Sequence, residues 1–91
     1  MSAESQAASL LRHGYIEVEE LRSFKVGGRC RHIGEQYPEA YRGTGTIERI
    51  FHRPQRGNDV EIIVKMDNPD GIRGSHGYWA DYHTVLVEAA A

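Results

Sequence analysis

The chain has 91 residues, of which 40% are hydrophobic and 26% are charged, and its formal net charge is −2 at pH 7. A chain of this size builds one hydrophobic core, which excludes a second independent domain. It contains no apolar run of the ~18 to 20 residues that a membrane span needs, and no basic start followed by an apolar leader. We therefore expect a cytoplasmic protein that makes no contact with a membrane.

The first predicted element is a short helix over residues 2–13, which are rich in Ala, Ser and Leu. Gly14 follows them and is a residue that helix C-termini favour. A helix of about twelve residues is marginal alone, so it either docks through Leu10 and Leu11 or frays. Residues 15–21 then alternate apolar and acidic side chains, which predicts a strand.

Residues 24–32 alternate cleanly, which predicts a half-buried strand whose outer face carries Lys25, Arg29 and Arg31. The adjacent glycines Gly27 and Gly28 predict a bulge or a tight bend early in this strand. Residues 34–43 follow neither the helical nor the strand period and predict an ordered loop. Residues 44–52 return to the β pattern.

Turn residues occupy positions 54–58, and the clearest strand of the chain follows over residues 60–66. Within it Ile63 interrupts the polar face, and as an exposed side chain it would support a weak homodimer. Residues 67–77 predict a long connection, residues 78–83 hold an aromatic cluster that we assign to loops, and residues 84–88 predict a last strand. The tail from residue 89 is expected to fray.

Five or six short strands with glycine-rich turns and little helix predict a mainly β protein. Closure into a barrel would remove the exposed edges of so small a sheet, so we expect a barrel over residues 15–88. An arm or short helix over residues 1–14 precedes it, and a frayed tail over residues 89–91 follows. We expect a monomer or a weak homodimer.

Two segments resemble a known class of small barrel. The run KVGGRCRH at residues 25–32, followed by GTGTIERI at residues 43–50, resembles the opening of SH3-like barrels of the Tudor and KOW type. The C-terminal Tudor-like domain of UvrD/PcrA-type helicases is a close instance of that pattern. Here Gly28 replaces the usual Asp, Cys30 replaces the usual Val, and the loop over residues 33–42 is longer.

The run GYWADYHTV at residues 77–85 resembles the segment of eukaryotic SH3 domains in which a short helical turn leads into the last strand, although the proline of that segment is absent. More loosely, residues 24–87 resemble short uncharacterised proteins of actinobacteria and their phages. These resemblances imply a single SH3-like barrel of five or six strands. Such barrels bind partners along a groove between aromatic loops.

Positive charge is concentrated in residues 22–56, which hold eight basic side chains against three acidic ones, whereas the remainder of the chain is strongly acidic. A patch of one sign attracts a partner of the opposite sign over roughly 8 to 10 Å. The alternative is that the two regions neutralise each other in the fold. The sequence leaves both interpretations open.

The preferred function is a non-enzymatic protein-interaction adaptor. Aromatic rings supply large contact area at low entropic cost, so the aromatic residues outside the strands are the candidate contacts, together with arginines of the neighbouring strands. The candidate partner-binding residues are Tyr37, Tyr41, Tyr78, Trp79, Tyr82, Arg29, Arg31 and Arg49. For Trp79 the alternative is a core role, closing one end of the barrel. A regulatory protein of phage or mobile-element origin that acts on a host factor would belong to the same class.

Nucleic-acid binding is the alternative function. Clustered cations contact phosphates and aromatic rings stack on unpaired bases, and the basic region offers both. Its residues are Arg29, Arg31, Arg42, Arg49, Arg53 and Arg56, with Tyr37 and Tyr41 between them. The near-neutral isoelectric point of 6.2 weighs against this alternative.

No enzyme, metal or cofactor is expected. Cys30 is the sole cysteine, so no internal disulfide forms, and we assign it to the core. Together with His32, His76 and His83 it lacks the spacing of a zinc site. The residues 67–71 lack the ligand alternation of a calcium loop, and no catalytic triad, phosphate-binding loop or paired-carboxylate motif is present.

Overall fold

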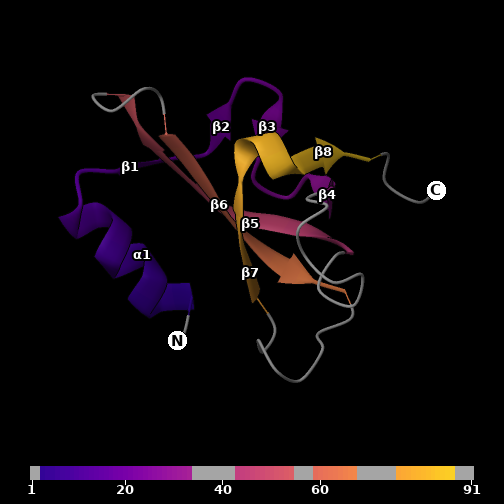
Figure 1. The fold of residues 1–91 in the computed structure, drawn as a ribbon, viewed down its shortest axis with the longest axis horizontal. Coiled ribbons are helices and arrows are strands. Elements are labelled where there is room, and N and C mark those ends of the chain that lie inside the picture. The colour runs from indigo at the N-terminus through magenta and orange to yellow at the C-terminus, as the bar shows by residue number, and fades with distance from the viewer. Residues whose placement is uncertain (1–2, 34–42, 55–58, 68–75, 88–91) are drawn as a thin grey trace.

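The computed structural model describes residues 3–33, 43–54, 59–67 and 76–87. Along the chain these form one helix, eight strands and one 3-10 turn (Figure 1): α1 Ala3–Arg12, β1 Ile16–Val18, β2 Glu20–Leu21, β3 Phe24–Lys25, β4 Arg29–His32, β5 Thr44–Arg53, β6 Asp59–Met66, β7 His76–Ala80, η3 Asp81–His83 and β8 Thr84–Leu86. The predicted mainly β class is confirmed. None of the helices in these ranges has the length and apolar character that crossing a membrane requires.

The main sheet is antiparallel, with the strand order β7-β6-β5-β4-β8. Strands β4 to β7 form a meander, and the chain then passes through η3 so that β8 pairs with β4 (Figure 1). The short strand β1 pairs with the C-terminal half of β5, while β2 and β3 form a separate hairpin. Within the described residues β7 and β8 are the two ends of this order, so the closed barrel expected from the sequence is not confirmed.

Both faces of the β5–β6 pair are buried. One face carries the larger core cluster, whose members are Phe24, Cys30, Ile47, Ile50, Val60, Ile62, Val64, Met66 and Trp79. A β-bulge between Ile47 and Arg49 adds one residue to β5. Because an added residue reverses the side-chain alternation, Ile47 and Ile50 point into the same core although they are three positions apart.

The other face of the pair is covered by α1, where Ala7 and Leu10 pack against Phe51 and Ile63. Docking through Leu10 is confirmed, whereas docking through Leu11 was wrong, because its side chain is 50% exposed. The expectation of an exposed Ile63 was also wrong. This side chain is fully buried beneath the helix, so it offers no surface for a homodimer.

Two predicted strands are each divided in two: residues 15–21 form β1 and β2, which are separated at Glu19, and residues 24–32 form β3 and β4. The segment predicted over residues 24–32 breaks at Gly27, whose φ of +91° favours glycine. There the Gly28 amide donates to the Lys25 carbonyl, and the bend predicted at these glycines is confirmed. The prediction that Tyr78 and Trp79 lie in loops was wrong, because both belong to β7. The loop predicted at residues 34–43 lies almost wholly outside the described residues. Most of the turn predicted at residues 54–58 also lies outside them.

Candidate partner-binding groove

An open groove of about 460 Å³ lies where the start of β6, the end of β7 and η3 meet the N-terminal segment. We name it the carboxylate groove. Its lining combines two tyrosines, three carboxylates, an arginine and two small apolar side chains: Tyr15, Arg22, Asp59, Val60, Glu61, Ala80, Asp81 and Tyr82. A cavity of this size is within the range of sites that hold a small ligand or a few side chains.

Two of the three carboxylates are neutralised by arginines. Asp81 forms an ion pair of 2.7 Å with Arg22, which lies in the turn between β2 and β3. Asp59 pairs at 2.7 Å with Arg53 of β5. The Arg53 guanidinium also lies 4.6 Å from the centre of the Tyr15 ring and donates to the His13 carbonyl at 3.1 Å. One face of Tyr15 is thereby already occupied by a cation.

Glu61 differs from the other two carboxylates. Its side chain has neither a hydrogen bond nor an ion pair with another described residue, whereas its backbone is paired with Ala80 of β7. Burial raises the pKa of Glu61 above its usual value of 4.5, and the neighbouring Asp59 raises it further. Burial also raises the pKa of Tyr15, against the lowering effect of Arg53. The groove therefore holds a carboxylate whose charge is incompletely compensated.

Tyr82 is the exposed end of a series of ring contacts that leads into the core. Its ring centre lies 4.3 Å from that of His83, which lies 5.3 Å from that of His32, and His32 meets Trp79 edge-on at 5.0 Å. Trp79 is 6% exposed and His32 is 6% exposed, whereas Tyr82 is 73% exposed. Tyr82 is thus the aromatic side chain of this series that a partner can reach.

The 3-10 turn that carries Tyr82 is fixed at both ends. The Thr84 hydroxyl donates to the Ala80 carbonyl at 2.8 Å across the turn. The Ile33 amide donates to the His83 carbonyl at 2.8 Å, which ties the turn to the end of β4. Since these bonds hold the backbone on both sides of Tyr82, binding need not order the turn, and that saves part of the entropic cost of association.

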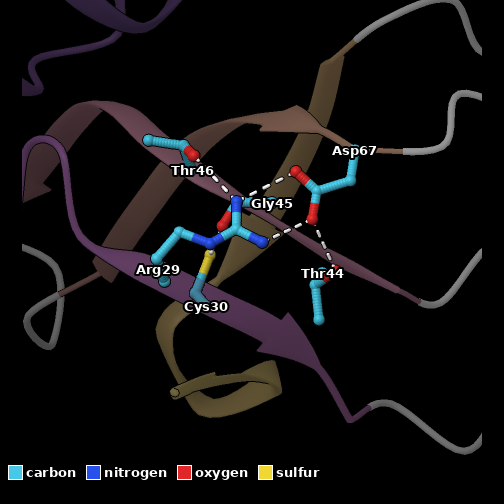
Figure 2. Close-up of polar contacts among 6 residues, drawn as sticks. All are labelled: Arg29, Cys30, Thr44, Gly45, Thr46 and Asp67. Atoms are coloured by element: carbon cyan, nitrogen blue, oxygen red, sulfur yellow. Dashed lines mark hydrogen bonds and ion pairs between the residues drawn. The ribbon is translucent and has the colours of Figure 1, made fainter. Parts of the chain in front are cut away.

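The arginines proposed as partner contacts are mostly engaged within the fold. Arg29 binds both carboxylate oxygens of Asp67, at 2.9 and 2.5 Å, and donates to Thr46 Oγ1 at 2.9 Å (Figure 2). Asp67 also accepts from Thr44 Oγ1 at 2.7 Å. Figure 2 shows the Arg29 guanidinium between these side chains, which come from β5 and from the end of β6.

Arg49 makes a similar two-point contact with Glu17 of β1, at 2.7 and 2.6 Å. Four arginines of the basic region are therefore paired with carboxylates from outside it, in the pairs Arg22–Asp81, Arg29–Asp67, Arg49–Glu17 and Arg53–Asp59. Of the two interpretations of the charge distribution, mutual neutralisation describes these arginines. Arg31 of β4 is exposed and forms no ion pair with another described residue.

The Arg29–Asp67 ion pair changes the acidity of both partners, because its hydrogen bonds raise the pKa of Arg29 and lower that of Asp67. The hydrogen bonds of Arg29, and then of Thr44, lower the pKa of Asp67 to about 2. Cys30 lies beneath this cluster, where its thiol donates a long contact of 3.7 Å to the Gly45 carbonyl. Burial raises the pKa of Cys30 to about 11, so the thiol stays protonated and unreactive near neutral pH. This agrees with the predicted core role of the cysteine.

The structure brings few of the predicted contact residues together. Tyr82 lines the carboxylate groove, whereas Trp79 lies in the core rather than on the surface. Tyr78 is half-buried and packs in the cluster beneath α1, so it does not join Tyr82. Tyr37 and Tyr41 lie outside the described residues. No group of three or more metal-binding side chains occurs in the described part of the chain.

Sequence analysis missed Tyr15, Glu61 and Asp81 as members of a site. Glu61 shares a face of β6 with Ile63, two positions further along the strand. The alternation predicted that face as polar and exposed, and only the docking of α1 buries it, so the sequence contained no signal for Glu61. No signal in the sequence placed Tyr15 near η3.

No protein-family model, curated protein or solved structure matches this chain.

Proposed function

We propose that the chain is a non-enzymatic protein-interaction module that holds a partner segment in the carboxylate groove, with Tyr82 as its principal aromatic contact. The observation that carries this proposal is the 73% exposure of a tyrosine on a backbone turn fixed at both ends, beside an open groove. Exposed aromatic rings on preorganised backbone are typical of residues that dominate binding energy.

We further propose that the fold is of the SH3-like class. The supporting observations are the four-strand meander β4 to β7, the 3-10 turn η3 just before β8, and the return of β8 to the side of β4. The turn lies where the resemblance to SH3 domains implies one. In such a fold the short turn before the last strand borders the binding surface, as η3 borders the carboxylate groove here.

The paired arginines favour a protein partner over a nucleic acid. Each of the four guanidinium groups already binds a carboxylate, so contact with a phosphate would require that ion pair to break or to share its cation. A low-salt anisotropy titration with a labelled single-stranded oligonucleotide measures the alternative directly. We expect no saturable binding.

A displayed library of random peptides tests the proposed function. We expect peptides selected on the parent chain to bind the Y82A variant at least tenfold more weakly, because truncating an aromatic contact of this kind costs more than about 1.4 kcal/mol. The matched control is V26A, since Val26 is 39% exposed and lies outside the groove. Circular dichroism establishes that both variants fold. A library that yields no binder, or binders indifferent to Y82A, refutes the proposal.

A further inference from the structure

Glu61 is the carboxylate of the groove whose charge is left uncompensated. Asp59 has Arg53 and Asp81 has Arg22, whereas Glu61 has no ion-pair partner in the described residues. It lines the groove and is paired through the backbone with Ala80 of β7, which lines the groove as well. A carboxylate in this position gains from any cation that enters the groove, because its partial burial reduces the screening by water.

The walls around Glu61 suit a flat cation with an apolar stem. Tyr15 and Tyr82 supply rings, and Ala80 supplies apolar surface. The Tyr15 ring already accepts the Arg53 guanidinium at 4.6 Å, so the local environment tolerates arginine against tyrosine. Guanidinium groups stack on aromatic rings and bind carboxylates through two hydrogen bonds, which ammonium groups do not.

We propose that the groove receives an arginine side chain of the partner segment, whose guanidinium pairs with Glu61 while the tyrosines contact its stem. This inference rests on the proposed function and names the feature of the partner that is recognised. The charge of the groove supports it. The three carboxylates are balanced by Arg22 and Arg53 alone, which leaves one negative charge for the incoming cation.

The inference also predicts the direction of a pH effect on binding. Asp59, on the same strand, is the charged group that acts on the Glu61 carboxyl. The other titratable and charged groups of the groove are Tyr15, Arg22, Asp81 and Tyr82, and Arg53 borders it through Asp59 and Tyr15. An incoming guanidinium stabilises the charged form of Glu61. Binding therefore weakens as the pH falls through the raised pKa of this carboxyl.

The test is a titration of the isotope-labelled full chain, followed by amide NMR, with the peptide acetyl-Gly-Ser-Arg-Ser-Gly-amide. Peptides with Gln or Lys in place of the arginine serve as comparisons. We expect the arginine peptide to shift the amide signals of Glu61, Ala80 and Tyr82, the lysine peptide to bind more weakly, and the glutamine peptide to leave these signals in place. The E61Q variant should bind the arginine peptide about tenfold more weakly, because the charge-assisted bonds are lost.

The matched control is E4Q, which removes the same charge from an exposed glutamate in the first turn of α1. Glu4 does not line the carboxylate groove, and Figure 1 shows α1 on the side of the sheet that the helix covers. E4Q should bind as the parent does. If E61Q fails to give a folded spectrum, the pH dependence of the parent chain replaces it, with affinity expected to fall between pH 7 and pH 4.

The outcomes separate this inference from the proposed function. Equal binding of the arginine and glutamine peptides, or full affinity of folded E61Q, overturns the arginine assignment. If library peptides still lose affinity with Y82A in that case, the binding function stands without it. If no peptide of either kind perturbs the groove, both proposals fail.

Discussion

Replacing Asp67 with asparagine tests the ion-pair cluster that joins β4, β5 and the end of β6 (Figure 2). The carboxylate accepts two hydrogen bonds from Arg29 and one from Thr44. The D67N side chain keeps one acceptor oxygen but loses the charge and turns a donor toward the guanidinium. The Arg29 and Asp67 side chains are 29% and 36% exposed, so solvent screens the pair. We expect the free energy of unfolding to fall by about 1 kcal/mol, not by the larger amount that breaking a buried pair would cost.

The pH dependence of the same substitution follows from the pKa of Asp67. Because the hydrogen bonds of Arg29 and Thr44 lower this pKa from 3.8 to about 2, the unfolded chain binds the proton more readily than the folded one. The stabilising contribution is therefore fully present well above pH 3.8 and is lost as the pH falls toward 2. The difference between the parent and D67N should shrink over this interval.

Urea denaturation followed by the fluorescence of Trp79 measures both effects, at pH 7, 5 and 3. The control is E20Q, since Glu20 is exposed and forms no ion pair with another described residue; its effect should stay within about 0.5 kcal/mol. An unchanged urea midpoint for D67N at pH 7 would show that the cluster does not stabilise the fold. A difference that keeps its full size at pH 3 would show that the carboxyl is not the cause.

Three further predictions concern packing. G45A should lower the free energy of unfolding by about 1 to 3 kcal/mol, because an added Cβ would lie 2.5 Å from the Val64 side chain. G43A is the control, since a Cβ there meets nothing within 4 Å. Thermal unfolding compares the two variants, and equal melting temperatures would contradict the prediction. L10A should lower the free energy of unfolding by about 2 to 5 kcal/mol and expose the amides of α1 to hydrogen exchange, whereas L11A should do neither. A larger effect of L11A than of L10A would refute the docking of α1 through Leu10. W79A should cost about 3 to 5 kcal/mol and abolish the near-ultraviolet dichroism of the fold; retention of that signal would show that the indole is not part of the core.

Local pattern predicted two elements closely, whereas the cleanly alternating residues 24–32 are divided by a turn at Gly27. The run from Val60 to Met66 became β6, and the helix over residues 2–13 became α1 with bounds one residue shorter at each end. Ile63 shows where local pattern stops being sufficient. Its place in the alternation is the polar face, and only the docking of α1, more than fifty residues earlier in the chain, makes that face buried. Periodicity identifies a face but not what covers it.

The candidate site was less predictable than the fold, because its members come from distant parts of the chain. The exposure of Tyr82 agrees with its predicted place in a loop. Trp79 of the same aromatic segment lies instead in β7, where the alternation of side chains directs it into the core. The excess of positive charge was visible in the sequence. Its neutralisation was not, since Arg22 meets a carboxylate 59 residues away and Arg29 one that is 38 residues away. Which arginine meets which carboxylate depends on the register of the sheet, and the composition of the chain does not determine that register.

The position of α1 over Phe51 and Ile63 has a practical consequence for trimming the chain. A version beginning at Tyr15 would keep every strand but uncover two large side chains that are fully buried in the intact protein. An exposed apolar surface of this kind favours self-association and lowers solubility, so the shortened chain should aggregate. Because α1 covers this face of the sheet, deletions and tags at the N-terminal end should leave the helix intact.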